Sequence, residues 1–153
     1  MRILKHILLF ITFLIIICNI PVKAITSIAD SLEKELSLTK DEKAKLILFN
    51  RLAKENASIS FEKSLKYGNQ ALSLAQKLGD QVKEVDALLS IGEAYSNQNQ
   101  FTEAFDYDTK AQKLSFKYGY KKGVAIALNA SGVNCYYQLK YNDALSYYYK
   151  SLA

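Results

Sequence analysis

Residues 88–111 have the sequence LLSIGEAYSNQNQFTEAFDYDTKA, and residues 128–151 have the sequence LNASGVNCYYQLKYNDALSYYYKS. Placed above each other, the two stretches match at a constant offset of forty residues and without a gap. The matched pairs include Leu88 with Leu128, Gly92 with Gly132, Ala104 with Ala144 and Tyr107 with Tyr147. The same offset relates Gly79 to Gly119. A fixed period of this length indicates a repeat architecture, in which one supersecondary unit recurs along the chain.

Within each period the apolar residues recur at intervals of three and four, as in Leu88, Ile91 and Tyr95. This spacing places them on one face of an α-helix and is not the alternation of a strand. The pattern predicts helices near residues 27–37, 41–57, 61–78, 83–98, 101–118, 123–138 and 141–153. The chain is therefore expected to be all-α.

The expected helix ends have their own sequence markers. Thr39 and Glu42 have the spacing of a capping box, in which a hydroxyl and a carboxylate satisfy amides at a helix start. Ser60 and Asn99 are predicted N-caps. Gly79 and Gly119 are predicted to end helices in the left-handed conformation, which costs glycine little because it lacks a Cβ.

These residues resemble a known repeat family. The succession Leu88, Ile91, Gly92, Tyr95, Phe101, Ala104 and Ala111 resembles the tetratricopeptide pattern, and Leu128, Ser131, Gly132, Cys135, Tyr141, Ala144 and Tyr148 repeat it. The preceding unit is degenerate, with Leu52 in the place of the glycine, and Asp108 occupies a place where the pattern has an aromatic residue. The long period is similar to that of tetratricopeptide repeats in bacterial exported and sensor-associated proteins. The resemblance implies an α-solenoid of antiparallel helix pairs, in which Gly92 and Gly132 allow close approach of a partner helix carrying Ala104 and Ala144.

The chain is predicted to have three parts: a signal peptide (1–24), an N-terminal helix and linker (25–40), and helical repeats (41–153), of which one is degenerate, one complete and one truncated. Arg2 and Lys5 precede an apolar run from Ile7 to Ile17, and cleavage is expected after Ala24. That run is too short to cross a bilayer as a helix. We therefore expect export to the periplasm or the medium, with a membrane anchor formed by an uncleaved segment as the alternative.

Composition excludes several functions for the expected mature chain. Cleavage removes three of the 20 basic residues and no acidic one, which leaves 17 against 15 and a net charge of +2, too little for a nucleic-acid-binding surface. It also removes His6, the only histidine, and leaves Cys135 as the only cysteine, so conventional catalytic triads and histidine zinc sites are not available. We predict no enzymatic activity, no metal and no cofactor. Asp106 with Asp108, and Glu93 with Glu103, are expected to be surface charges.

The resemblance implies that the first helix of each pair lines a concave, partner-binding face. Carried over by position, this face comprises Phe49, Asn50, Ala53, Asn56, Asp86, Leu89, Ser90, Glu93, Asn97, Ile126, Asn129, Val133, Tyr136 and Tyr137. The mixture of apolar, aromatic and amide side chains is suited to a peptide strand or helix. The predicted function is an exported protein- or peptide-binding scaffold. The alternative is the N-terminal sensory portion of a longer bacterial membrane signalling protein, a histidine kinase or a transcriptional regulator.

The last repeat carries a further expectation. The chain stops at Ala153 within the helix that begins near Tyr141, whereas a repeat array normally closes with a polar capping helix. We therefore expect apolar side chains of Tyr147, Tyr148 and Leu152 to be uncovered and the chain to self-associate through its C-terminal end. Membrane contact is expected only through the signal segment, if that segment remains uncleaved.

Overall fold

The computed structural model describes residues 28–152, which form helices joined by short turns and contain no strand. A helix over residues 28–38 comes first. It is followed by α2 (Glu42–Asn56), α3 (Phe61–Leu78), α4 (Gln81–Asn97), α5 (Phe101–Tyr118), α6 (Lys121–Tyr137) and α7 (Tyr141–Ser151). The all-α prediction is confirmed. The signal peptide predicted for residues 1–24 lies outside the described residues.

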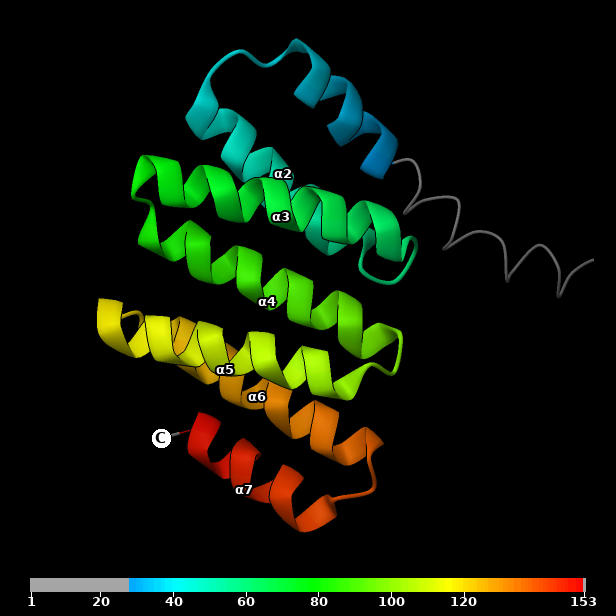
Figure 1. Ribbon diagram of the computed structural model, residues 1–153, viewed down its shortest axis with the longest axis vertical. Helices are drawn as coiled ribbons and strands as arrows, with labels where there is room; N and C mark the ends of the chain where they lie inside the picture. Colours follow the sequence, from blue (N-terminus) through cyan, green and yellow to red (C-terminus); the bar gives the residue numbers. More distant parts are fainter. Residues whose placement is uncertain (1–27, 153) are drawn as a thin grey trace, which may run out of the picture.

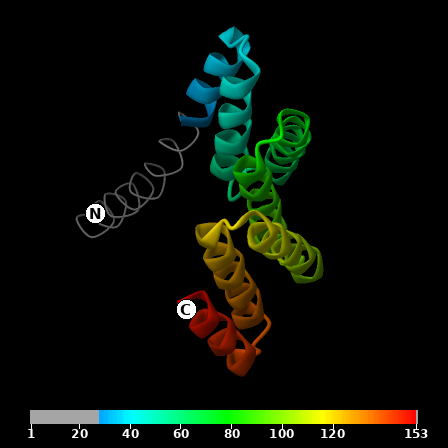
Figure 2. The ribbon, with the colours of Figure 1, turned by 90° about the vertical axis from the view of Figure 1, so that its left-hand side faces the viewer.

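Successive helices pack side by side and form the pairs α2/α3, α4/α5 and α6/α7, which stack along the length of the molecule (Figure 1). The first helices of neighbouring pairs also touch, α2 with α4 and α4 with α6. The backbones of α3, α5 and α7 lie further from one another, although the ring of Phe105 on α5 packs edge-on against Tyr147 on α7. Figure 2 shows the resulting layered stack from the side. One face is therefore built from α2, α4 and α6, as in an α-solenoid.

The core is distributed along this stack. One cluster joins Leu46 of α2 to Ala71 and Ala75 of α3 and Ala87 of α4. Another repeats the arrangement one pair further on, with Val85 and Leu88 of α4, Ala111 of α5 and Ala127 of α6. Each cluster thus links a helix pair to the first helix of the next pair. Stability is expected to be a sum of interfaces between neighbours.

The glycines predicted to allow close helix packing do so, but against side chains other than the predicted alanines. A Cβ built on Gly92 would lie 2.8 Å from Oδ1 of Asp108 and 3.4 Å from the carbonyl oxygen of Ala104. A Cβ on Gly132 would lie 2.6 Å from the ring of Tyr148. Asp108 and Tyr148 occupy equivalent positions in their repeats, one turn beyond Ala104 and Ala144. The side chain at this position therefore faces each glycine.

Three of the predicted caps are confirmed. Gly79 and Gly119 follow α3 and α5 with φ of 68° and 67°, the left-handed region. Ser60 precedes α3, and its side chain accepts a hydrogen bond from the backbone N–H of Lys63 at 3.4 Å. These residues end or begin helices for the reasons that their residue types suggest.

Two other predicted caps are wrong. Asp41, and not Thr39, caps α2, because its carboxylate accepts a hydrogen bond from the Ala44 N–H at 2.8 Å. The Thr39 hydroxyl instead donates to the Glu35 carbonyl of the preceding helix. Asn99 is a turn residue with φ of 59°, and Gln100 is the residue that precedes α5. Asparagine tolerates the left-handed conformation better than most residues, which explains its place in the turn.

Helices α4 and α6 begin at Gln81 and Lys121, two residues earlier than predicted. At α4 the carboxylate of Asp80 accepts from the Lys83 N–H at 3.0 Å and fixes the earlier start. Among residues 28–152, none of the helices has the length and apolar character needed to cross a membrane.

Candidate partner-binding groove

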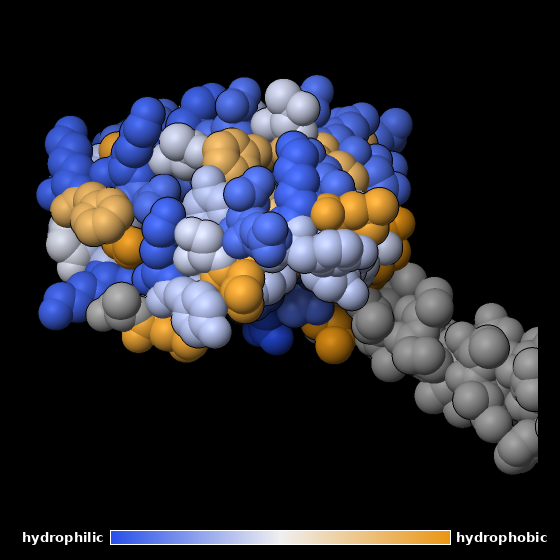
Figure 3. All heavy atoms as spheres, turned by 90° about the horizontal axis from the view of Figure 1, so that it is seen from below, coloured by the Kyte–Doolittle hydropathy of each residue, from blue (hydrophilic) through white to orange (hydrophobic). Residues whose placement is uncertain are grey.

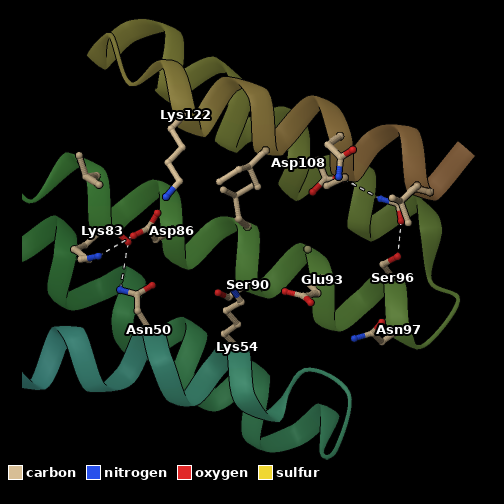
Figure 4. Close-up of a pocket in the computed structure, with 18 of the residues that line it drawn as sticks. Asn50, Lys54, Lys83, Asp86, Ser90, Glu93, Ser96, Asn97, Asp108 and Lys122 are labelled. Atoms are coloured by element: carbon tan, nitrogen blue, oxygen red, sulfur yellow. Dashed lines mark hydrogen bonds and ion pairs between the residues drawn. The ribbon is translucent and has the colours of Figure 1, made fainter. Parts of the chain in front are cut away.

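An open groove of about 760 Å³ runs along the face formed by α2, α4 and α6 (Figure 4). Four residues of α2, Ile47, Asn50, Arg51 and Lys54, recur at intervals of three and four and so share the face that lines it. Helix α4 contributes residues from Val82 to Asn97, and α6 contributes residues from Lys122 to Tyr137. The first helix of every pair therefore contributes to the groove.

The structure brings most of the sequence-predicted contact residues together in this groove. They are Asn50, Asp86, Leu89, Ser90, Glu93, Asn97, Ile126, Asn129, Val133 and Tyr137. Their role in binding a partner stays a prediction.

The remaining predicted contact residues do not line the groove. Phe49 stacks on Tyr67 with ring centroids 6.2 Å apart, and Ala53 is fully buried in the core. Asn56 is buried, and its amide donates to the Leu52 carbonyl at 2.8 Å. On α2, these three positions are rotated away from the face that carries Asn50, because successive residues of a helix turn by about 100°. Tyr136 is exposed beside the groove and packs edge-on against Tyr137.

One end of the groove is lined by the N-terminal parts of α4 and α6. The ammonium of Lys83 pairs with Asp86 at 2.8 Å, and the hydroxyl of Tyr120 donates to the same carboxylate at 3.4 Å. The hydrogen bond to Asp86 raises the pKa of Lys83. Asn50 donates to the Lys83 carbonyl at 3.5 Å. Lys122 extends into the groove beside this set (Figure 4). Sequence reasoning missed both lysines, since lysine on a helix is ordinarily a solvated surface residue.

Between its two ends the groove is lined by both apolar and uncharged polar side chains. Leu89, Ile126 and Val133 of α4 and α6 are apolar, and Ser90 and Asn129 lie among them, while Ile47 of α2 also lines the groove. Ile126 is 39% exposed and Ile47 is 56% exposed, so the groove presents hydrocarbon surface to solvent. Apolar surface with a few polar groups is the usual composition of a ligand-binding site.

At the other end a chain of polar groups crosses three helices (Figure 4). The hydroxyl of Ser96 on α4 donates to the amide oxygen of Asn134 on α6 at 2.5 Å, and the Asn134 amide nitrogen donates to Oδ2 of Asp108 on α5 at 2.8 Å. Asp108 is only 1% exposed, and burial raises its pKa to about 7. The expectation that Asp108 is a surface charge beside Asp106 is wrong, because the close approach of α4 at Gly92 covers it.

Glu93 of α4 lines the same end of the groove and is exposed. Partial desolvation by the groove walls raises the pKa of its carboxyl, and the charge of Lys54 on α2 lowers it. Asn97, one turn further on, donates from its amide to the carbonyl of Ala57 at 3.0 Å, which fixes the end of α4 to the turn after α2. This end of the groove is therefore rich in oxygen acceptors.

Comparison with solved structures identifies the fold as that of tetratricopeptide repeats. The crystal structure of the TPR domain of Arabidopsis FLU superposes with a TM-score of 0.65 and 23% identity, over 73% of this chain and 95% of that domain. Aspartyl phosphate phosphatase F from Bacillus subtilis superposes with a TM-score of 0.71 and 17% identity, over 78% of this chain. This chain spans about a third, 32%, of the phosphatase chain. No family model and no curated protein sequence matches the chain. The resemblance inferred from the repeats is thus confirmed for the fold.

Proposed function

We propose that this protein is a scaffold that binds a peptide segment of a partner protein in the groove of α2, α4 and α6. The observation that carries the proposal is the composition of the groove: apolar side chains such as Ile126 and Leu89 lie among polar ones, and charged side chains lie toward both ends. Apolar anchors give a peptide most of its affinity, and the polar groups around them fix its position. An amphipathic helix or an extended strand has the matching pattern of side chains.

A binding screen with matched variants tests this proposal. Arrayed peptides are probed with the chain from residue 25 onward, with Ile126→Asp, and with Phe116→Asp as the control. Ile126 is 39% exposed and Phe116 is 66% exposed, but Phe116 lies on α5, outside the groove. We expect peptides that bind the wild-type chain to bind Ile126→Asp about tenfold or more weakly, since a charge in an apolar contact is strongly unfavourable. Equal affinity for all three proteins would contradict a groove-binding function.

We further propose that the protein is exported and acts outside the cytoplasm. The basic start, the short apolar run and the small residue at Ala24 support this location. Cell fractionation combined with N-terminal sequencing tests it, and a chain starting near Ile25 outside the cytoplasm is the expected result. Recovery of a cytoplasmic chain that keeps Met1 would exclude export.

A further inference from the structure

We propose that the end of the groove between Glu93 and Asp108, here called the acidic end, binds one basic side chain of the partner peptide, an arginine or a lysine. The inference rests on the proposed function, since it names the chemistry that the same groove selects. Three observations support the inference: the positions of the Glu93 and Asp108 carboxylates, their lack of ion-pair partners, and the charges at the opposite end of the groove.

Asp108 lacks the partners that a buried carboxylate normally has. Its Oδ2 accepts from Asn134, but its Oδ1 has no hydrogen-bond partner. Most buried polar atoms in proteins are paired, and an unpaired one calls for a ligand or another specific explanation. Asp108 and Gly92 both line the groove, and Oδ1 of Asp108 lies only 2.8 Å from the position that a Cβ on Gly92 would take. A carboxylate held in this way favours a nearby positive charge, because the low dielectric strengthens the attraction.

Glu93 adds a second negative charge at the same place. Within residues 28–152 the ion pairs are Lys63 with Glu33, Lys77 with Glu42 and Lys83 with Asp86, so neither Glu93 nor Asp108 has an ion-pair partner there. Lys54 lies close enough to lower the pKa of Glu93 but outside ion-pair distance. The acidic end also lies near the last turns of α4 and α6, where the negative end of the helix dipole favours cations.

The opposite end of the groove excludes a basic side chain. Its one carboxylate, Asp86, is already paired with Lys83 and accepts from Tyr120. Lys122 adds a further positive charge there. The two carboxylates without an ion-pair partner therefore lie toward the ends of α4 and α6, and Lys83 and Lys122 lie at their starts, while α2 adds Arg51 and Lys54 to the lining. A peptide with one basic residue is therefore held in a single direction.

The pH dependence of binding follows from the groups that face the acidic end. They are Lys54 on α2, Glu93 on α4 and Asp108 on α5, while α6 contributes the uncharged Asn134 and Tyr137. Burial holds the pKa of Asp108 at about 7, so its negative charge is lost as the pH falls below neutrality. Affinity for a basic peptide should therefore increase between about pH 6 and about pH 8.

The test uses short neutral peptides, rich in leucine, serine and alanine, in which one position is scanned with Arg, Gln or Glu. Fluorescence anisotropy measures their affinity for the wild-type chain, for Glu93→Gln, for Asp108→Asn and for the control Glu103→Gln, which removes an exposed carboxylate of α5 outside the groove. We expect the best Arg peptide to bind the wild type about tenfold more tightly than its Gln counterpart at about pH 8. Glu93→Gln and Asp108→Asn should each reduce this preference, and Glu103→Gln should keep it.

Two failures are distinguishable. If Arg, Gln and Glu peptides bind equally and Ile126→Asp weakens all of them, the groove binds peptides and the acidic-end proposal is overturned. If no peptide binding depends on Ile126, both proposals fail. A preference for Arg that survives in Glu93→Gln and Asp108→Asn together also overturns the inference. Loss of the pH dependence in Asp108→Asn, with helicity unchanged by circular dichroism, supports it.

Discussion

Asp108 has a different environment from the residues at the same place in the other repeats. The forty-residue offset relates it to Gly68 and Tyr148, neither of which carries a charge. Asp108 is almost fully buried against Gly92 and has one hydrogen bond, from Asn134. Burial without a counter-ion costs free energy when the side chain ionises, so the residue opposes folding at neutral pH.

The first prediction is that Asp108→Asn stabilises the fold at about pH 8. The pKa of Asp108 is about 7 in the folded protein, against 3.8 for the free side chain. Between these values the folded state binds more protons than the unfolded state, so stability falls as the pH rises. Above the folded pKa, the variant should gain about 1–3 kcal/mol, the usual cost of a buried unsatisfied polar group. Urea denaturation from about pH 4 to about pH 8 measures this difference.

The control is the shape of the two pH profiles. The gain from Asp108→Asn should shrink toward about pH 4, where aspartate is neutral in the folded protein. Parallel profiles for the two proteins would show that Asp108 ionises as freely in the folded state as in the unfolded chain.

The second prediction concerns the close approach of α6 and α7. Gly132→Leu should destabilise the protein by roughly 1–3 kcal/mol, because the new side chain overlaps the ring of Tyr148. Thermal or urea unfolding measures the cost. In a Tyr148→Ala background the same change should cost less, since the overlapping ring is absent. An equal cost in both backgrounds would place the strain somewhere other than at this contact.

The sequence predicted most of its contact residues on the first helices correctly, Glu93 among them, but missed Asp108 and the two lysines, Lys83 and Lys122. The helical period was sufficient for Asn50 and Glu93, because residues three or four positions apart share a face. Asp108 comes from a second helix, and its contact with Gly92 depends on how two helices cross. A lone aspartate in a polar stretch is ordinarily exposed, so no local signal marked it as buried.

At the scale of helices, the ends depend on competition between neighbouring polar groups. Thr39 has the spacing of a capping box, yet Asp41 lies closer to the helix start and bonds to Ala44. Its negative charge also favours the positive end of the helix dipole. The periodic pattern predicted the existence and order of all helices described here, because apolar spacing averages over many residues. Ends depend on one or two hydrogen bonds and were predicted less well.

The third prediction compares two helix starts. Asp80→Ala should cost about 1 kcal/mol, because Asp80 accepts from the Lys83 N–H at 3.0 Å. Gln100→Ala is the matched change before α5, where the residue makes no side-chain capping bond. It should leave the free energy of unfolding within about 0.5 kcal/mol of wild type. Similar losses for both variants, measured by urea denaturation, would exclude capping as the cause.

The degenerate repeat has its large and small residues on the opposite helices from the later repeats. Where the later repeats have glycine on the first helix, α2 has Leu52, and where they have Asp108 and Tyr148 on the second helix, α3 has Gly68. Leu52 is fully buried, and a Cβ on Gly68 would lie 2.6 Å from Ile91 of the next pair. The small residue of this unit therefore lies on the second helix, where it makes room for Ile91 of the next pair.

At the scale of the whole molecule, one repeat position shows how each pair covers the one before it. Phe61 packs edge-on against Tyr95 of the next pair at 5.4 Å between ring centroids, and Phe101 stacks on Tyr137 of the next pair at 6.2 Å. The equivalent residue of α7 is Tyr141, which is 56% exposed. The surface that neighbouring repeats bury is therefore open on α7.

The prediction that Tyr147 and Tyr148 are uncovered is wrong, because both are half-buried, Tyr148 against Gly132 and Tyr147 against Phe105, whereas Leu152 is exposed as predicted. The open surface is an apolar stripe along another side of α7. Tyr141, Leu145, Tyr149 and Leu152 follow one another at helical spacing, and their exposed fractions are 56%, 52%, 66% and 84%. Figure 3, which views the molecule from below, shows apolar groups among polar ones on that side. Contiguous apolar patches larger than a few hundred Å² are uncommon on monomers and mark interaction surfaces.

The last prediction is that the chain self-associates through this stripe. Sedimentation velocity at increasing concentration should show a species larger than the monomer for the wild type, since association removes the exposed leucines and tyrosines from water. Leu145→Lys combined with Tyr149→Lys should shift the population to monomer, because two ammonium groups oppose burial of the stripe. Phe116→Lys is the control: Phe116 is 66% exposed on α5, away from α7's stripe, and its replacement should leave association unchanged. A wild-type chain that stays monomeric at high concentration would exclude the contact, whereas equal dissociation by all variants would place it elsewhere on the surface.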